Sequence, residues 1–425
     1  MSEVVVSPPE HVFRAAINLP GDKSLSHRAL LLAGMAEGES RVANLGPGED
    51  VAATAAVLAQ LGVGVDDGVV RSPGVRAWRD PGGPLDCGNS GTTMRLLAGA
   101  LAAQPFRVTL DGDASLRNRP MRRLIGPLAG LGANVETSPT GTPPITTGDR
   151  ALAGSEIEIP IASAQVRSAV ALAAIQAEGE SIVDSPPGFR DHTERWLGAF
   201  GLGERLSATR FRVTPGAVPP AQYVIPGDTS SAAYLWASAA IVPGARVETL
   251  GISLNPGRLG FLQVLEAMGA RVEAEVTGAV LDDLVGDVIV EGRSLQATKV
   301  EGPLASATID ELPLVAVLGA YAEGITVVAD AADLAGKESD RIGSTVEMIR
   351  ALGGGAEPAP DGFSVVGTGF LESGTVHAAG DHRIAMCAAV AASGATGPVR
   401  IEGAETAAVS WPGFFEEMEH VWSSR

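Results

Sequence analysis

Residues 21–33 read GDKSLSHRALLLA, a glycine and an aspartate followed by lysine, serine and an apolar run. Such an opening is typical of a helix N-terminus, and the apolar run after it predicts a helix that is buried on most sides. The pattern returns five times, and the six openings centre on residues 22, 89, 164, 228, 307 and 381. Their spacings of 67, 75, 64, 79 and 74 residues predict six copies of one structural unit.

A second helix is predicted in these copies, because five apolar runs end in a glycine. The glycine follows Leu61, Leu131, Phe200, Met268 and Leu352. Short runs such as RVTLDG, ARVETL, ITVVAD and VRIEGA have the composition of strands. Each copy is therefore expected to hold two helices and several short strands, which makes the chain an α/β protein.

The copies divide the chain into two halves, because three precede residue 226 and three follow it. We predict an N-terminal half over 19–225 and a C-terminal half made of 1–18 and 226–425. Two similar halves joined by short crossings favour a cleft that closes on a ligand. The alternative is a pair of rigid domains without a functional cleft.

Composition and charge exclude several classes of protein. The chain has 425 residues, 45% of them hydrophobic, and a net charge of 31 − 50 = −19, so a general binder of nucleic acid or anionic membranes is not expected. Two cysteines cannot form a disulfide framework. The opening residues lack the features of a signal peptide, and no apolar run reaches the length of a membrane span, about 18 residues. We expect a cytoplasmic protein.

The helix openings carry groups that suit anionic ligands, since the N–H groups and the dipole of a helix N-terminus attract negative charge. Each motif alone has an ordinary explanation: a capped surface helix for residues 20–28, a solvated charge cluster for 336–341, a structural role for His382. Glu311 is expected to be a plain charge at a helix N-terminus. Six openings, several of which carry Lys or Arg, indicate an anion site if they converge.

Several chemistries lack their sequence signatures. The chain has no GxxxxGK[ST] phosphate loop, no GxGxxG in a strand–helix context and no GxSxG elbow. The six histidines form no HxxxH or HxH pair. We therefore expect no metal and no organic cofactor.

Taken together, the motifs resemble those of the 5-enolpyruvylshikimate-3-phosphate synthases. They are, in order, PGDKSLSHRA, GNSGTTMR, GDASLRNRPM, SAQVRSA, RDHTE, GDTSSAAY, IDELP, GKESDR and GDHRIAM, and they span residues 20–387. The resemblance implies a two-domain inside-out α/β barrel, with three repeats in each domain, that closes over its substrates. It also implies a glyphosate target of the shikimate pathway, which leads to chorismate and the aromatic amino acids.

The implied reaction moves the enolpyruvyl group of phosphoenolpyruvate to the 5-hydroxyl of shikimate 3-phosphate and releases phosphate. It proceeds by addition and elimination through a tetrahedral ketal. The resemblance assigns proton transfer to Asp310 and Glu338, with Lys23 as a third catalytic residue. The residues it assigns to shikimate 3-phosphate are Lys23, Ser24, Arg28, Ser163, Ala164, Gln165, Arg190, Asp310 and Lys337. Those it assigns to phosphoenolpyruvate are Lys23, Gly91, Arg119, Gln165, Arg341 and Arg383.

The chemistry of the substrates agrees with this assignment. Two carboxylates and two phosphates in one site need many cations, and the reaction needs a base near the hydroxyl and an acid near the vinyl carbon. The expected partners are these two small molecules, with no nucleic acid and no membrane, and the family likeness implies a monomer.

The chain departs from the family pattern in three places. Ala164 replaces a second serine, so that one contact becomes a backbone contact. Residues 405–414, ETAAVSWPGF, lack a lysine that some relatives use toward phosphoenolpyruvate. Leu96 follows Arg95 where other relatives have a proline. Gly91 is the small residue whose enlargement weakens glyphosate binding in the family, which implies sensitivity here.

Two other functions stay open at this point. UDP-N-acetylglucosamine enolpyruvyl transferase shares the fold, but it has Lys-Asn where this chain has Lys23 and Ser24, and it uses a cysteine in a mobile loop. A non-catalytic anion-binding protein of the same fold is the other. The pair of Asp310 and Glu338 disfavours it, because a site that only bound anions would not carry two carboxylates.

Overall fold

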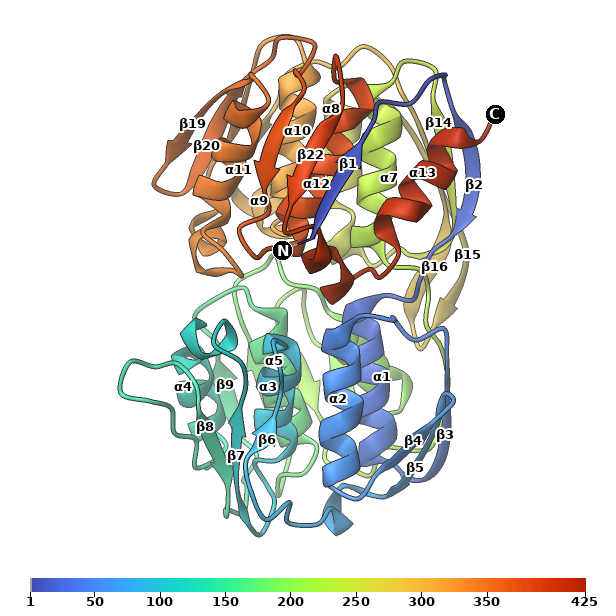
Figure 1. Ribbon diagram of the computed structural model, residues 1–425. Coiled ribbons are helices and arrows are strands. Elements are labelled where there is room, and N and C mark those ends of the chain that lie inside the picture. The colour runs from blue at the N-terminus through green and yellow to red at the C-terminus, as the bar shows by residue number, and fades with distance from the viewer. Residues whose placement is uncertain (1) are drawn as a thin grey trace. The chain divides into compact units, whose positions relative to one another are not determined.

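The computed structural model describes residues 2–425, and its contacts divide the chain into two compact units (Figure 1). Unit 1 comprises the chain up to Pro20 together with Gly227–Gly278 and Leu284–Arg425. Unit 2 comprises Gly21–Pro226 and Ala279–Asp283. Each unit has its own hydrophobic core.

Unit 2 consists of three helix pairs and three small sheets. Its inner helices are α1 (Lys23–Met35), α3 (Gly91–Ala100) and α5 (Ala164–Ala174), and its outer helices are α2 (Glu49–Gln60), α4 (Ile125–Ala129) and α6 (His192–Ala199). The first sheet has the order β13-β3-β5-β4, with β3 Glu37–Ala43, β4 Gly64–Asp66, β5 Val69–Pro73 and β13 Gln222–Val224. The second has the order β6-β7-β8, with β6 Leu85–Asp86, β7 Arg107–Asp111 and β8 Ile145–Gly148. The third has the order β11-β12-β10-β9, with β9 Glu156–Glu158, β10 Ser181–Asp184, β11 Gly203–Arg205 and β12 Phe211–Val213.

Unit 1 repeats this plan. Its inner helices are α7 (Thr229–Ile241), α10 (Leu312–Tyr321) and α12 (His382–Ala391), and around them lie α8 (Gly260–Ala267), α9 (Gly302–Ala307), α11 (Arg341–Ala351) and α13 (Phe414–Ser423). One sheet has the order β15-β16-β14-β2, with β2 Arg14–Asn18, β14 Arg246–Ser253, β15 Arg271–Val280 and β16 Asp283–Glu291. The next has the order β17-β18-β20-β19, with β17 Lys299–Val300, β18 Ile325–Val328, β19 Gly355–Ala359 and β20 Gly362–Val366. The last has the order β1-β22-β21, with β1 Glu3–Val6, β21 Gly374–His377 and β22 Val399–Glu402.

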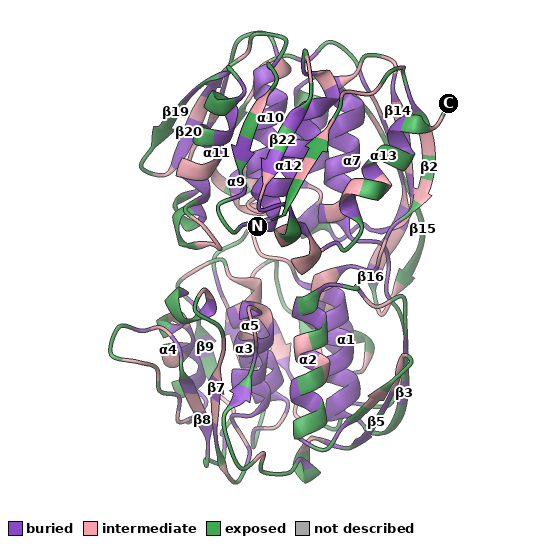
Figure 2. Cartoon of the chain, viewed as in Figure 1, coloured by how far each residue is buried: buried purple, intermediate pink, exposed green. Residues whose placement is uncertain are grey.

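The inner helices are buried on nearly all sides, whereas the outer helices bury one face (Figure 2). The inner helices are buried because their sequences are apolar. Helix α10, for example, has the sequence LPLVAVLGAY without a charged residue, and it is buried from Leu312 to Ala320. Small residues let such helices pack closely with sheets around them. The predicted fold, six α/β repeats with helices inside and sheets outside, is therefore confirmed.

Five of the six predicted openings lie at the start of an inner helix. The exception is the opening centred on Ala307, the fifth in chain order. Ser306 and Ala307 end the short helix α9, and α10 begins only at Leu312. Pro313 fixes that start, since a proline fits the first turn of a helix, where its missing N–H costs nothing. The shift leaves Asp310 in the turn between two helices.

The glycine stops are confirmed. Helix α2 ends at Gln60 and Gly62 follows in the left-handed region with φ 97°. Helix α8 ends in the same way before Gly269, where φ is 99°. A left-handed residue at this position satisfies the last carbonyl groups of a helix, and glycine adopts it without steric cost.

The turn between β15 and β16 belongs to unit 2, although the sequence assigns it to the C-terminal half with both strands. Val280 and Leu281 pack against the core of unit 2. Arg195 Nη1 donates to the carbonyl of Asp282 at 2.9 Å. Asp283 is fully buried and pairs with His192 Nδ1 at 2.5 Å. The turn therefore holds the N-terminus of α6.

Candidate functional site

The first group of predicted residues lies at the N-terminus of α1 in unit 2. Asp22 caps the helix, since its carboxylate accepts from the backbone N–H of Leu25 at 2.9 Å. Lys23 Nζ pairs with Asp50 Oδ2 of α2 at 2.9 Å, and its side chain stays partly exposed. Ser24 follows in the same turn. A cap, a cation and a hydroxyl at one helix N-terminus suit a phosphate or carboxylate.

Arg28 is buried one turn further along α1. Its guanidinium donates from Nε to Thr193 Oγ1 at 2.8 Å and from Nη2 to Ser168 Oγ at 2.9 Å, and Nη1 donates to the carbonyl of Ser24 at 2.8 Å. These bonds join α1 to α5 and α6. Burial lowers the pKa of Arg28 to about 10, so it remains a cation near neutral pH.

The N-termini of α3 and α5 meet because the two helices pack at very short range. A Cβ on Gly99 would lie 2.0 Å from the carbonyl oxygen of Ala169, so only glycine fits there. At the N-terminal ends, Gln165 Nε2 donates to Thr92 Oγ1 at 2.9 Å and Arg95 Nη1 donates to Gln165 Oε1 at 2.6 Å. Gln165 therefore lies beside α3.

Gly91 lies between two guanidinium groups. A Cβ at this position would be 3.0 Å from Nη1 of Arg95 and 3.3 Å from Nη1 of Arg119. Arg119 Nη2 also donates to Asn89 Oδ1 at 2.5 Å. Unit 2 thus brings Gly91, Arg119 and Gln165 together, and adds Arg95, which the sequence reasoning did not assign. Arg95 could have been found, since it closes the quoted motif GNSGTTMR.

The resemblance described above implies that Gly91 lies beside phosphoenolpyruvate, and on that expectation Gly91→Ala should raise the KM for phosphoenolpyruvate by about 3–30-fold and leave the melting temperature nearly unchanged. The new methyl group would push the mobile ends of Arg95 and Arg119, which can shift without backbone strain. Steady-state kinetics with each substrate varied in turn checks this. An unchanged KM for phosphoenolpyruvate would separate Gly91 from that ligand.

The remaining residues predicted in unit 2 lie around α5 and before α6. Ser163 caps α5, its hydroxyl accepting from Val166 N at 3.4 Å, and Ala164 is the first residue of the helix. Arg190 precedes α6 by two residues and lies close enough to Arg28 for its charge to lower the pKa of Arg28. The unit therefore holds five cationic side chains in or beside the first turns of its helices: Lys23, Arg28, Arg95, Arg119 and Arg190.

A chain of hydroxyl groups under these N-termini ends in a buried histidine. His27 Nδ1 lies 2.7 Å from Thr54 Oγ1, Thr54 Oγ1 lies 2.6 Å from Thr93 Oγ1, and Thr93 donates to Ser90 Oγ at 2.7 Å. Ser90 caps α3, so the chain joins α1, α2 and α3. Burial lowers the pKa of His27 to about 3, with Asp50 opposing that shift and Lys23 and Arg28 adding to it.

Acid should therefore destabilise the protein through His27. Its folded pKa lies below its ordinary value of 6.5, so from pH 6.5 down to about 3 the unfolded chain takes up a proton that the folded chain does not. The free energy of unfolding should fall by up to ~1.4 kcal/mol per pH unit in that range. Urea unfolding from pH 7 to 4 measures this, and His27→Gln should flatten the dependence. Equal slopes in both proteins would contradict the prediction.

In unit 1 the predicted residues gather around Arg341, whose side chain is 1% exposed. Its Nε lies 2.7 Å from Asp381 Oδ2, its Nη2 lies 2.5 Å from Glu338 Oε2, and its Nη1 lies 3.7 Å from Asp310 Oδ1. Burial alone would lower the pKa of Arg341, but Asp381 and Glu338 outweigh it and hold the pKa above its usual range. The segment 336–341 is therefore not a solvated charge cluster.

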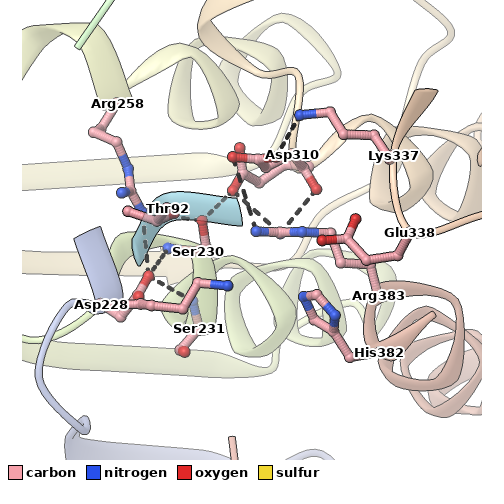
Figure 3. A network of polar contacts seen from close by, with 12 residues as sticks. Thr92, Asp228, Ser230, Ser231, Arg258, Asp310, Lys337, Glu338, His382 and Arg383 are labelled. Atoms are coloured by element: carbon pink, nitrogen blue, oxygen red, sulfur yellow. Dashed lines mark hydrogen bonds and ion pairs between the residues drawn. The ribbon is translucent and has the colours of Figure 1, made fainter. Parts of the chain in front are cut away.

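Asp310 lies among three cations, Arg341 and the Lys337 and Arg383 that Figure 3 labels beside it. Lys337 Nζ is 3.3 Å from Asp310 Oδ1, and Arg383 Nη2 is 3.9 Å from Asp310 Oδ2. Arg383 Nη1 also donates to the carbonyl of Asp310 at 2.8 Å. Burial lowers the pKa of Lys337, and the neighbouring charges of Arg341 and Arg383 act in the same direction, whereas Asp310 and Glu338 oppose the shift.

Glu311 is not the plain helix charge that the sequence suggests. Its side chain is buried, accepts from Ser230 Oγ at 2.5 Å and lies 3.6 Å from Arg383 Nη1. His382 is buried as well, at the start of α12. Arg258 and Ser230 complete this cluster. Ser230 belongs to the motif GDTSSAAY, to which the sequence analysis assigned no role, and Arg258 lies outside every quoted motif.

The charges of this cluster are close to balance. Lys337, Arg341, Arg383 and Arg258 supply four positive charges, and Asp310, Glu311, Glu338, Asp381 and Asp228, the partner of Arg258, supply five negative charges, so the formal sum is 4 − 5 = −1. A set of carboxylates held between cations suits proton transfer better than the tight binding of an anion. The convergence of the six helix openings on one anion site stays a prediction.

Neither cysteine has the surroundings of a nucleophile. Cys87 and Cys387 are buried, and burial raises the pKa of Cys87 to about 12 and the pKa of Cys387 beyond that. A thiol needs a lowered pKa to react at neutral pH. The apolar run around Cys387 predicts a buried thiol at that position, and the structure agrees.

Residues 2–425 contain no group of three or more His, Cys, Asp or Glu side chains placed to hold a metal ion. Over the same residues, no helix has the length and apolar character needed to cross a membrane.

Comparisons with known proteins agree with one another. A family model described as EPSP synthase (3-phosphoshikimate 1-carboxyvinyltransferase) matches residues 9–418. A 3-phosphoshikimate 1-carboxyvinyltransferase of Herpetosiphon aurantiacus is 43% identical over 417 residues, which cover 96% of this chain and 97% of the relative. One from Xanthomonas campestris pv. campestris is 43% identical over 408 residues, covering 94% of this chain and 93% of the relative.

Solved structures show the same fold. The EPSP synthase of Acinetobacter baumannii superimposes with a TM-score of 0.86 at 36% identity, covering 99% of this chain and 98% of that one. The enolpyruvyl transferase NikO of Streptomyces tendae superimposes with a TM-score of 0.77 at 17% identity, covering 99% of this chain and 97% of that one, and this likeness concerns the fold alone. From the match to the family model over nearly the whole chain and the identity to these relatives, the chain belongs to the EPSP synthase family.

Proposed function

We infer that the protein is a transferase that moves the enolpyruvyl group of phosphoenolpyruvate to the 5-hydroxyl of shikimate 3-phosphate. The family match over residues 9–418 carries this conclusion. The local structure supports it, because each predicted site residue lies at or beside the N-terminus of a helix in one of two clusters. UDP-N-acetylglucosamine enolpyruvyl transferase is not favoured by these comparisons.

The unit 2 cluster is proposed to bind the phosphate and ring of shikimate 3-phosphate. Arg28 uses three of its five N–H groups on Thr193, Ser168 and the backbone of Ser24, which fixes the guanidinium and leaves two groups for the ligand. Ser163 and Ala164 at the start of α5 offer a hydroxyl and backbone N–H groups, and Arg190 adds charge. Lys23, Ser24 and Gln165 complete the proposed set.

Phosphoenolpyruvate is assigned to residues of both clusters. Gly91 leaves room beside Arg119, and a guanidinium binds a carboxylate or phosphate with two parallel hydrogen bonds. Gln165 lies next to them through Arg95. Arg341 and Arg383 are the proposed ligands in unit 1, and Lys23 is shared between the two substrates.

The proposed chemistry conserves every proton. The 5-oxygen forms a bond to C2 of phosphoenolpyruvate while its proton leaves and C3 gains a proton, which gives a tetrahedral ketal. The bond from C2 to the phosphate oxygen then breaks, phosphate leaves, and C3 returns one proton. Asp310 and Glu338 are the proposed proton carriers, with Lys337 beside Asp310. The lowered pKa of Lys337 eases its proton exchange with that carboxylate.

The substrate test measures the release of inorganic phosphate. Release should require phosphoenolpyruvate and shikimate 3-phosphate together, and neither alone should support it. Release with UDP-N-acetylglucosamine in place of shikimate 3-phosphate would overturn the proposal.

A further inference from the structure

Glu311 occupies a capping position without acting as a cap. The inner helices α1, α3, α5, α7 and α12 are each capped by the side chain of the residue that precedes them. Helix α10 is preceded by Glu311, whose side chain makes no such bond to its own helix. The carboxylate instead faces Ser230 and Arg383, so a function other than helix capping must account for it.

The side chain of Glu311 ends a buried polar chain within unit 1. Asp228 Oδ1 lies 3.1 Å from Arg258 Nη2, and the same nitrogen donates to Ser230 Oγ at 2.9 Å (Figure 3). Ser230 Oγ in turn donates to Glu311 Oε1 at 2.5 Å. Asp228, Ser230, Arg258 and Glu311 are all buried. Because Ser230 accepts from a cation and donates to an anion, each of its bonds strengthens the other.

The other side of Glu311 faces Arg383. Glu311 Oε1 lies 3.6 Å from Arg383 Nη1, and that nitrogen also donates to the carbonyl of Asp310 at 2.8 Å. The two residues that precede α10 therefore contact the same nitrogen of Arg383, Nη1. Asp310 accepts from it through its backbone carbonyl, and Glu311 attracts it through its charge. The charge of Glu311 also contributes to the raised pKa of Arg383.

We propose that Glu311 is a positioning residue for Arg383, held in place through Ser230, Arg258 and Asp228. It fixes the rotamer in which Arg383 presents its other edge to phosphoenolpyruvate. This inference rests on the proposed role of Arg383 as a ligand. Glu311 is not proposed as a substrate ligand, because its Oε1 faces Ser230 and Arg383.

Two substitutions distinguish a positioning role of Glu311 from a merely structural role. Glu311→Gln keeps the length of the side chain and an oxygen that can accept from Ser230, but it removes the charge that faces Arg383. Ser230→Ala removes the bond that aims Glu311 and leaves the charge in place. Both changes should act on phosphoenolpyruvate and spare shikimate 3-phosphate.

The experiment compares KM values for the two substrates in Glu311→Gln, Ser230→Ala and the double variant. Glu311→Gln should raise the KM for phosphoenolpyruvate by about 5–50-fold, with the KM for shikimate 3-phosphate and the kcat within about threefold of wild type. The double variant should be no worse than Glu311→Gln alone, because both changes break one chain. Glu266→Gln, an exposed change on α8, is the control.

Arg383→Lys distinguishes a failure of the positioning role of Glu311 from a failure of the proposed ligand role of Arg383. If it raises the KM for phosphoenolpyruvate while Glu311→Gln does not, Glu311 is not a positioning residue and the proposed function stands. If Arg383→Lys also leaves that KM unchanged, the ligand role of Arg383 is wrong and the inference falls with it. An equal rise of both KM values in Glu311→Gln, with a lower melting temperature, would show a merely structural role and overturn the inference.

Discussion

Glu338→Gln should lower kcat by about 10²–10⁴-fold and change both KM values by less than about fivefold. The carboxylate is one of the two proposed proton carriers, and the amide cannot exchange a proton at neutral pH. Glutamine keeps the size of the side chain and an oxygen for Arg341 Nη2, which lies 2.5 Å from Glu338 Oε2. Arg341 also retains Asp381 at 2.7 Å, so the fold of the cluster should persist.

The matched control is Glu347→Gln, an exposed glutamate on α11. It should leave kcat, both KM values and the melting temperature as in the wild type. Rates of phosphate release at saturating substrate make the comparison. A kcat of Glu338→Gln within threefold of the wild type would remove Glu338 from the reaction.

A second large effect is expected for Arg28→Lys, which should raise the KM for shikimate 3-phosphate by about 10–100-fold. Lysine cannot make the three bonds by which Arg28 joins Thr193, Ser168 and the backbone of Ser24. Burial already lowers the pKa of the arginine to about 10. The same burial would lower the pKa of a lysine further from its ordinary value of ~10.4, so its charge should be lost at a lower pH.

A pH series distinguishes this account from a simple loss of packing. In Arg28→Lys the KM for shikimate 3-phosphate should climb as the pH rises above about 7, because the lysine loses its proton while the wild-type arginine stays charged. Arg150→Lys, an exposed change in unit 2, should show neither effect. A KM in Arg28→Lys equal to that of the wild type would remove Arg28 from the phosphate site.

Sequence reasoning reached the repeats and the inner helices because both depend on local patterns. Asp22 and Asp381 cap their helices at the predicted openings, and Gly62 ends α2 as expected. It missed the start of α10, where Pro313 decides the helix boundary and the apolar pattern alone does not.

Contacts between distant segments could not be read from those patterns. Glu311 looks like an ordinary helix charge until the fold places Ser230 and Arg383 beside it. The turn at Ala279–Asp283 lies within a hairpin of the C-terminal half, and only packing shows that it holds α6 through His192. The net charge of the unit 1 cluster could not be predicted either, because it depends on which carboxylates the fold places beside which cations.

The most direct test of the central claim, proton transfer through a ketal, is to run the reaction in deuterium oxide and analyse the enolpyruvyl methylene group of the product. Addition places a solvent-derived deuteron on C3 of phosphoenolpyruvate, and elimination then removes one of three hydrogens, so much of the product should carry deuterium at this carbon. A product whose methylene group contains no deuterium at full conversion would contradict the account.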